Sequence, residues 1–288
     1  MLTVLAFGLT GPTETIEAAD RSAPSLLALG DSIAFGWTAR SDHAVAPDMI
    51  GYPDLAAHRL HLADVNLSCP GQATGGFISL SGNDNGCWSY RAESPLHVAY
   101  QGTQLAAAAA ALRSHRQVRV ISITLGANDY LHLRAHCLPT PGCYQEQAPA
   151  MLAAVTANLD AILGALRGTG YRGIIAMLAY YALIDDAAGV VQVDALNHAI
   201  AVAARRYDAV VVDGMQAFGR AAGSRSYCAA GFLAPTWAGN CDIHPSVLGR
   251  SLLATALVDA VRGAGGAVAG PPPADRSASG EQVTGMGA

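Results

Sequence analysis

Short apolar runs and longer segments of helical periodicity alternate through the middle of this chain. The apolar runs have the length and composition of buried strands, and they lie at residues 25–30 (SLLALG), 65–68, 119–126 (RVISITLG), 173–180 and 209–213 (AVVVD). Segments with helical spacing or a high alanine content lie at residues 52–62, 104–116, 149–167, 191–206 and 246–262. Strands that alternate with helices favour a parallel sheet covered on both faces, so we expect an α/β fold.

The two ends of the chain differ from this middle part. Residues 2–9 (LTVLAFGL) are apolar, and Glu17-Ala18-Ala19 could precede a cleavage site, although the positive charges that begin a secretory signal are absent. The C-terminal residues are rich in Gly, Pro, Ala and Ser without apolar periodicity. We therefore expect a signal-like or disordered N-terminus (1–24), one folded domain (25–262) and a disordered tail (263–288).

Charge and hydropathy exclude several classes of protein. The 288 residues include 17 basic side chains, all of them Arg, and 22 acidic ones, which gives a formal net charge of −5. This balance argues against nucleic acid as a partner bound through general charge. No apolar run reaches the roughly 18–20 residues of a membrane span, so no transmembrane segment is expected. The length is sufficient to bury a substantial core.

Polar groups follow three of the predicted strands and precede the last predicted helix. The groups are the hydroxyl of Ser32, the backbone amide of Gly71, the carboxamide of Asn128 and the imidazole of His244. An acyl-transfer site needs a nucleophile, a base and oxyanion donors, and these four residues can supply them. Each also has a structural interpretation: Ser32 as a helix N-cap, Asn128 as a turn residue, Gly71 as a loop glycine and His244 as a surface histidine.

Two other histidines have a spacing that metal sites use. His132 and His136 are four positions apart, a spacing that places two ligands on one face of a helix. They fall in a predicted loop, and no carboxylate pattern accompanies them. We therefore expect no metal there.

Four motifs in order resemble those of the SGNH, or GDSL, hydrolases. They are GDSI (30–33), the glycine after the second strand (Gly71), GAND (126–129) and DIHP (242–245). The resemblance spans about residues 26–253, and the SCPGQAT segment with the scattered cysteines is most similar to secreted actinobacterial esterases and lipases of that family. It implies a three-layer α/β/α sandwich with a five-stranded parallel, flavodoxin-like sheet.

The resemblance also implies the chemistry. Ser32 would be the nucleophile of a serine esterase or lipase and His244 its general base, acting through an acyl-enzyme on carboxylic esters. The N–H groups of Ser32 and Gly71 and the side chain of Asn128 would form the oxyanion hole. No cofactor is implied, and the partner is a small-molecule or lipid ester. Fatty-acyl, aryl and acetyl-sugar esters all remain open, and a carbohydrate acetylesterase is the alternative.

One position departs from the family pattern. The family has Asp three residues before the histidine, where this chain has Cys241, and Asp242 stands only two residues before His244. Three interpretations remain open: Asp242 reaches the ring through a different turn, a backbone carbonyl near Cys241 orients the ring, or Asp242 caps the following helix. Loss of a triad carboxylate costs roughly four orders of magnitude in enzymes that depend on one.

The six cysteines fall into neighbouring pairs beside the candidate motifs. We predict three disulfide bonds although six cysteines allow 15 connectivities, and the pairs are Cys69–Cys87, Cys137–Cys143 and Cys228–Cys241. They favour a secreted, extracellular protein. Reduced thiols in a cytosolic protein are the alternative.

Two other classes of protein compete with an esterase. Metallophosphoesterases also use Asp, Asn and His after strands. Their D-x-H motif comes first in the chain and a His directly follows their GN pair, whereas here Asp242-Ile243-His244 comes last and no His directly follows GAND. A non-catalytic binding domain on the same scaffold is the other rival, and the intact Ser32, Asn128 and His244 argue against it. Beside the motifs, Trp37, Phe35 and Tyr130 are candidates for lining the substrate pocket or for plain packing. A monomer is expected by default.

Overall fold

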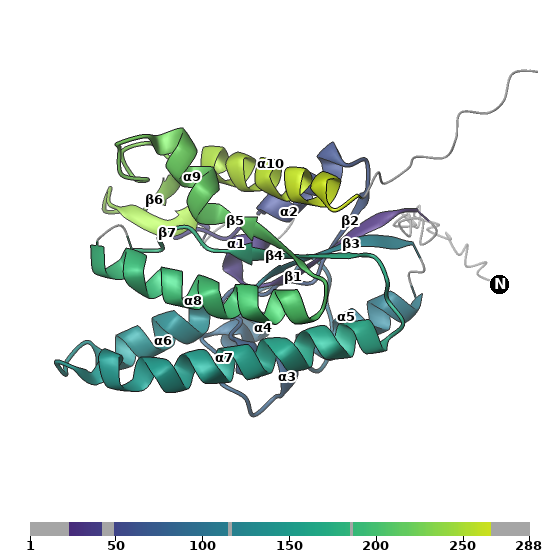
Figure 1. The fold of residues 1–288 in the computed structure, drawn as a ribbon, viewed down its shortest axis with the longest axis horizontal. Coiled ribbons are helices and arrows are strands. Elements are labelled where there is room, and N and C mark those ends of the chain that lie inside the picture. Colours follow the sequence, from purple (N-terminus) through teal and green to yellow (C-terminus); the bar gives the residue numbers. More distant parts are fainter. Residues whose placement is uncertain (1–22, 42–48, 115–116, 185–186, 266–288) are drawn as a thin grey trace, which may run out of the picture.

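Five parallel strands form the central sheet of the protein (Figure 1). The computed structural model describes residues 23–41, 49–114, 117–184 and 187–265. The strands follow the order β2-β1-β3-β4-β5, which is the flavodoxin-like order. They are β1 (Ser25–Gly30), β2 (Ala63–Asn66), β3 (Val118–Thr124), β4 (Ile174–Ala179) and β5 (Val210–Asp213). The predicted five-stranded parallel sheet is confirmed, whereas residues 1–22 and 266–288, including most of both expected terminal segments, lie outside the described residues.

Helices cover both faces of this sheet and complete the three-layer α/β/α sandwich. Figure 1 shows one layer made of α2 (Tyr52–Arg59), α9 (Gly214–Ala222) and α10 (Val247–Gly263). The opposite layer contains α5 (Gln104–Ser114), α7 (Cys143–Gly168) and α8 (Ala187–Arg206). The inner strand β1 is buried along its whole length because both layers pack on it. The flanking layers explain why the inner strands β1 and β4 are continuous apolar runs rather than alternating ones.

Helix α7 extends further than its periodicity predicted. It begins at Cys143, so Pro149, the expected first residue, lies inside the helix. By length and composition α7 could also cross a membrane. Its inward face instead lies in the core of the sandwich, through Val155, Leu159, Ile162, Leu163 and Leu166.

Several elements around the carboxyl ends of the strands were not predicted. Five are helices: α1 (Ser32–Phe35), α3 (Thr74–Ile78), α4 (Cys87–Glu93), α6 (Ala127–Cys137) and α9, which follows β5. The prediction of a loop at His132 and His136 was wrong, because both lie on α6. A two-stranded antiparallel ribbon, β6 (Leu233–Pro235) with β7 (Cys241–Pro245), precedes the last helix and was not predicted either.

All six cysteines form disulfide bonds beside these elements. The bonds are Cys69–Cys87, Cys137–Cys143 and Cys228–Cys241. The first joins the start of the loop after β2 to the start of α4. The second joins α6 to α7, and the third ties β7 to the loop before β6.

Candidate active site

Ser32 is the first residue of α1 and follows β1 through a tight turn. Gly30 makes this turn with φ of +120°, and a Cβ atom there would lie 1.8 Å from the carbonyl oxygen of Thr124. Asp31 caps the helix by accepting a hydrogen bond of 2.9 Å from the N–H of Ile33. Because the first N–H groups of a helix have no intrahelical acceptor, the N–H of Ser32 is available to a substrate.

Gln104, which the sequence did not single out, holds this turn from the side. Its side chain, fully buried on α5, accepts from the N–H of Gly30 at 2.5 Å and donates to the carbonyl of Gly30 at 3.0 Å. Both backbone groups of a buried glycine are thereby engaged. The turn that presents Ser32 is fixed by a residue 74 positions away.

His244 lies on β7 with its ring against Ser32. Its Nε2 is 2.8 Å from Oγ of Ser32, and its Nδ1 is 2.8 Å from Oδ2 of Asp242. The ring is 6% exposed. Trp37 packs on it edge to face, with 4.7 Å between ring centroids. Two hydrogen bonds therefore link the hydroxyl of Ser32, the imidazole of His244 and the carboxylate of Asp242 in a chain.

The carboxylate of Asp242 is held by backbone groups as well. Oδ2 accepts from the N–H of Ala39 at 2.8 Å, and Oδ1 accepts from the N–H of Ile243 at 2.7 Å. Burial acts to raise the pKa of Asp242, but the hydrogen bond and charge of His244 and the two N–H groups together bring the pKa below its ordinary value. Ser246, not Asp242, caps α10, so the interpretation of Asp242 as a helix cap was wrong.

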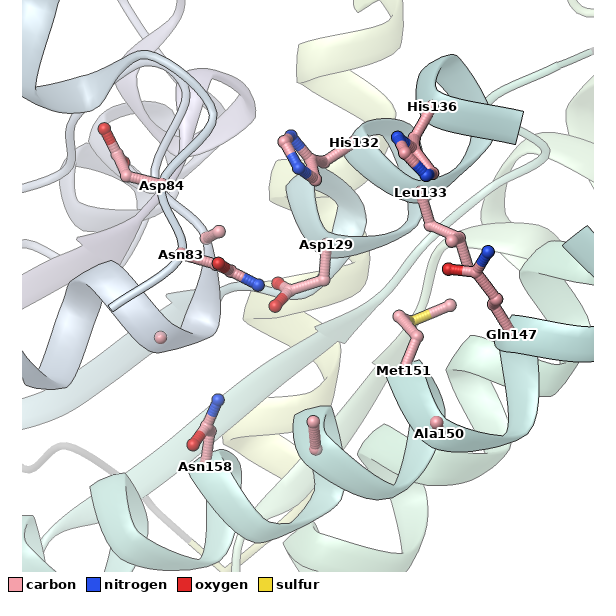
Figure 2. A pocket seen from close by; sticks show the side chains of 13 residues that line it. Asn83, Asp84, Asp129, His132, Leu133, His136, Gln147, Ala150, Met151 and Asn158 are labelled. Carbon is pink, nitrogen blue, oxygen red and sulfur yellow. The ribbon is translucent and has the colours of Figure 1, made fainter. Parts of the chain in front are cut away.

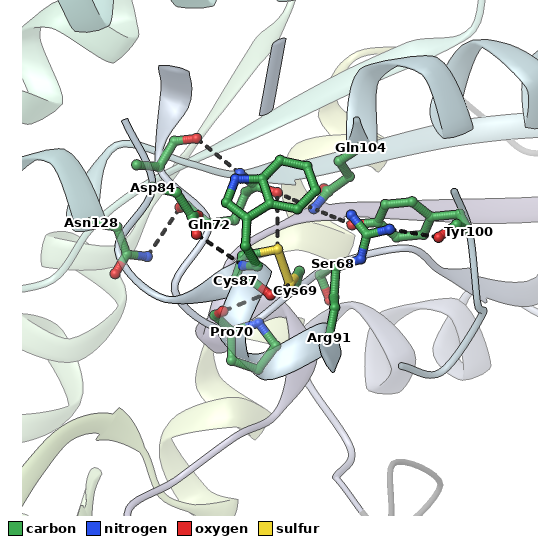
Figure 3. The surroundings of a disulfide bond; sticks show 12 residues. Ser68, Cys69, Pro70, Gln72, Asp84, Cys87, Arg91, Tyr100, Gln104 and Asn128 are labelled. Carbon is green, nitrogen blue, oxygen red and sulfur yellow. Dashed lines mark hydrogen bonds between the residues drawn. A yellow bond between two sulfur atoms is a disulfide. The ribbon is translucent and has the colours of Figure 1, made fainter. Parts of the chain in front are cut away.

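The other two candidate residues line the same pocket as His244. Gly71 has φ of +83°, and a Cβ atom there would lie 2.5 Å from the carbonyl oxygen of Asn85. Asn128 is 5% exposed and donates from Nδ2 to the carbonyl of Gln72 at 3.1 Å (Figure 3). Asn128, Gly71, Ser32 and His244 all line one pocket of ≈ 290 Å³.

The remaining walls of this pocket are partly aromatic and aliphatic. They consist of Trp37, Pro70, Asn85, Gly86, Tyr90, Leu131 and Ile243. Of the three aromatic residues proposed from the sequence, only Trp37 lines the pocket. Phe35 is fully buried against Tyr90, and Tyr130 is fully buried with its hydroxyl bonded to Gln192 at 2.9 Å.

A buried carboxyl lies next to Ser32 in the chain. Asp31 is 1% exposed, and its Oδ2 accepts from the hydroxyl of Tyr180 at 2.8 Å. The same hydroxyl accepts from the N–H of Ala127, beside Asn128, at 3.2 Å. Burial raises the pKa of Asp31 to about 7, against the opposing effect of the hydrogen bonds from Tyr180 and the backbone. Tyr180, from the end of β4, thus connects the turn before Ser32 with the start of α6.

A second pocket, of ≈ 490 Å³, lies between α6, α7 and the loop after β2 (Figure 2). Asp129 of the GAND motif lines it and accepts two hydrogen bonds from Thr74, at 2.9 Å from the N–H and 2.6 Å from the hydroxyl. Asp129 therefore joins α6 to the start of α3. His132 and His136 also line this pocket, and no group of three or more potential metal-binding side chains occurs among the described residues.

The sheet order and the residues gathered at the strand ends are those of three-layer α/β/α hydrolases. The sequence model of the GDSL-like lipase/acylhydrolase family matches residues 28–252, and the chain belongs to this family. The protein is therefore a carboxylic ester hydrolase.

Solved structures share the fold at low sequence identity. An acetylxylan esterase from Geobacillus stearothermophilus is 20% identical, with a TM-score of 0.52 over 85% of this chain and 95% of that chain. An α/β hydrolase enzyme from the metagenome of Lake Arreo, Spain, is 18% identical, with a TM-score of 0.51 over 84% and 96% of the two chains. No curated protein sequence matches the chain.

Proposed function

We propose that the protein hydrolyses carboxylic esters through an acyl-enzyme formed on Ser32. The observation that carries this proposal is the pair of 2.8 Å contacts from Ser32 to His244 and from His244 to Asp242, at the edge of a pocket. A serine hydroxyl is a weak nucleophile until a neighbouring base accepts its proton. Nε2 of His244 is within reach to do so, while Nδ1–H donates to Asp242 and keeps the ring in the required tautomer.

In the first half of the reaction, Oγ of Ser32 attacks the ester carbonyl as its proton moves to Nε2 of His244. The carbonyl oxygen becomes an oxyanion, which the N–H groups of Ser32 and Gly71 and Nδ2–H of Asn128 bind. The bond from carbon to the alcohol oxygen then breaks, and the alcohol leaves with the proton from His244. The ionised Asp242 stabilises the imidazolium that exists between these two proton transfers.

Water completes the second half of the reaction. His244 accepts a proton from water, whose oxygen attacks the acyl carbon of the ester on Ser32. The same three donors bind the second oxyanion. Collapse of this intermediate returns the proton to Oγ of Ser32 and releases the carboxylic acid, so the cycle needs only substrate and water.

The size of the pocket supports short acyl groups as substrates. Its ≈ 290 Å³ must hold the acyl group and the first atoms of the alcohol. That volume is at the lower end of the range for small-molecule sites, roughly 300–1,000 Å³. We therefore propose acyl chains of about two to four carbons, with acetylated carbohydrates as the second candidate because the pocket is open enough to leave a bulky alcohol outside.

Replacement of the nucleophile tests the reaction itself. Ser32→Ala should abolish hydrolysis of nitrophenyl acetate, and a fluorophosphonate should label intact protein at Ser32 but not this variant. The matched control is Ser81→Ala, on an exposed loop, which should hydrolyse and label like the wild type. Undiminished hydrolysis by Ser32→Ala would end the proposal.

A substrate series separates the remaining alternatives. Nitrophenyl esters from acetyl to palmitoyl should show kcat/KM falling beyond about four acyl carbons, and an acetylated xylo-oligosaccharide tests the carbohydrate ester directly. A preference for the long-chain esters would contradict the short-acyl assignment. Phosphate monoesters, assayed with and without a chelator, test the metallophosphoesterase class, for which we expect no turnover.

We also propose that the protein acts outside the cell. Support comes from the three disulfide bonds, which persist in oxidising compartments. Thiol titration of denatured native protein should detect no free cysteine. Six titratable thiols in protein isolated under conditions that trap them would contradict extracellular residence.

A further inference from the structure

Asn85 contacts both oxyanion donors that lie outside the nucleophile turn. Its backbone N–H donates to the carbonyl of Gly71 at 3.0 Å. Its side-chain Nδ2 donates to Oδ1 of Asn128 at 2.8 Å. No sequence motif includes this residue, and it lies in the loop before α4.

The hydrogen bond from Asn85 to Asn128 favours one orientation of the side-chain amide of Asn128. A carboxamide has one acceptor and one donor end, and only the donor end can stabilise an oxyanion. Oδ1 of Asn128 faces the donor Nδ2 of Asn85, and Nδ2 of Asn128 faces the carbonyl of Gln72. A reversed amide would set an oxygen against the Gln72 carbonyl and a nitrogen against the nitrogen of Asn85. Both neighbours therefore favour the orientation that presents N–H to the substrate.

The loop that carries Asn85 is itself held in place. The disulfide bond Cys69–Cys87 closes it two residues after Asn85 and two residues before Gly71 (Figure 3). Asp84 accepts from the N–H of Trp88 at 2.9 Å and so binds a backbone group in the first turn of α4. The backbone of Asn85 packs so closely on Gly71 that only a glycine fits below it. Asn85 is thus fixed by covalent and hydrogen bonds rather than by burial, since its side chain is exposed at the pocket.

We infer that Asn85 is a positioning residue of the oxyanion hole, which acts through Asn128 and Gly71 rather than on the substrate. The inference rests on the proposed function, because it assigns Asn128 and Gly71 as donors. A residue of this kind raises kcat by pre-orienting a donor and contributes little to ground-state binding.

Removal of the side chain gives the first test. Asn85→Ala keeps the backbone bond to Gly71 and deletes the donor to Asn128. Loss of one hydrogen bond to a neutral group should lower kcat for nitrophenyl acetate roughly 3- to 10-fold, with KM changed less than about twofold. Unchanged kcat, or an effect confined to KM, would overturn the inference, the latter because it would mark Asn85 as a substrate contact.

A double-mutant cycle adds a readout that a general structural role would not produce. In the Asn128→Ala background the amide that Asn85 orients is gone, so Asn85→Ala should lower kcat by less than about twofold further. An equal loss in both backgrounds would show that Asn85 acts independently of Asn128, and would overturn the inference.

Reversal of the polarity gives the sharpest variant and keeps the side chain nearly isosteric. In Asn85→Asp the carboxylate repels Oδ1 of Asn128 and attracts its Nδ2, which favours the reversed amide. We expect a kcat lower than that of Asn85→Ala and approaching the ~10²–10³-fold loss typical of a missing oxyanion donor. Activity equal to or above that of Asn85→Ala would contradict the orientation argument.

The neighbouring Asn83 provides a matched control. Its side chain lines the separate pocket between α6 and α7 (Figure 2), so Asn83→Ala should retain wild-type kcat. If Ser32→Ala is inactive but Asn85→Ala and Asn128→Ala have additive effects on kcat, only the inference about Asn85 is rejected. An active Ser32→Ala would instead reject the proposed function beneath it.

Discussion

Nδ1 of His244 lies 2.8 Å from Oδ2 of Asp242, although only one residue separates them along the chain. The reason is that residues 241–245 form the strand β7. Side chains at positions i and i+2 of a strand point to the same face, whereas the residue one position earlier points to the other. Cys241 uses that other direction to form its disulfide bond with Cys228.

Replacement of Asp242 tests whether this carboxylate takes part in catalysis. Asp242→Ala leaves His244 without its charged partner, and we expect kcat/KM to fall by about 10²–10⁴. Asp242→Asn keeps the size of the side chain but not the charge that stabilises the imidazolium, and it should lose most of the same activity. The measurement is steady-state hydrolysis of nitrophenyl acetate.

The control for this prediction is Asp259→Ala, on the exposed side of α10, which should retain full activity. Near-normal turnover in Asp242→Ala would remove the carboxylate from the mechanism. A backbone carbonyl would then have to orient the ring.

The ribbon β6–β7 illustrates what the sequence could not predict. The inner strands β1, β3 and β4 can be predicted from the sequence because they are mostly buried and mostly apolar. Residues 241–245 (CDIHP) have no such pattern, because β7 pairs with only the short strand β6 and is partly exposed. Its extended form depends on the pairing and on the Cys228–Cys241 bond, which are contacts between distant residues.

The Cys228–Cys241 disulfide bond is therefore predicted to support activity as well as stability. In the loop-entropy description a closed loop of 13 residues contributes about 3 kcal/mol and one of 6 residues about 2 kcal/mol. Replacing both Cys228 and Cys241 by Ser should lower Tm and also kcat, since Cys241 adjoins Asp242. The paired replacement of Cys137 and Cys143 should lower Tm with little effect on kcat. Equal kcat in the two double variants would show that the ribbon keeps its shape without the bond.

The residues of the candidate site also fall into two groups, those that the sequence marks and those that it does not. Ser32, Gly71, Asn128 and His244 each stand at the end of a strand or before a helix, where a local motif marks them. Gln104, Asn85 and Tyr180 carry no such mark. Gln104 lies within an alanine-rich helix and Tyr180 ends an apolar strand, and their roles exist only through partners 74 and 149 residues away, Gly30 and Asp31. Sequence patterns report local conformation, so these supporting contacts needed the folded structure.

Gly71 offers a test of backbone geometry in the proposed oxyanion hole. Its φ of +83° disfavours any side chain, and an added Cβ would lie 2.5 Å from the carbonyl oxygen of Asn85. Gly71→Ala should therefore displace the donor N–H and lower kcat by more than about tenfold. Gly168→Ala, at the end of α7 where nothing lies within 4 Å of the added atom, is the control and should leave kcat unchanged. A fully active Gly71→Ala would show that this N–H does not bind the oxyanion.

The buried carboxyl of Asp31 predicts a pH dependence of stability that is opposite to that of a salt-bridged aspartate. Burial raises its pKa from 3.8 to about 7, so in this interval the folded state holds a proton that the unfolded state has released. The free energy of unfolding must then fall as the pH rises through the interval, by on the order of 4 kcal/mol from this group. Asp31→Asn retains the acceptor for Ile33 and cannot ionise.

Chemical denaturation from about pH 4 to pH 8 measures the effect as the difference in the free energy of unfolding between wild type and Asp31→Asn. The wild type should lose stability relative to the variant as the pH rises, and the difference should level off above about pH 7, where Asp31 is ionised in both states. Tyr180→Phe removes a hydrogen bond that lowers the pKa of Asp31, so the decline should extend to higher pH in that variant. A difference that stays flat across the range would mean that Asp31 ionises inside the folded protein as readily as in water, and that the bond to Tyr180 suffices to carry its charge.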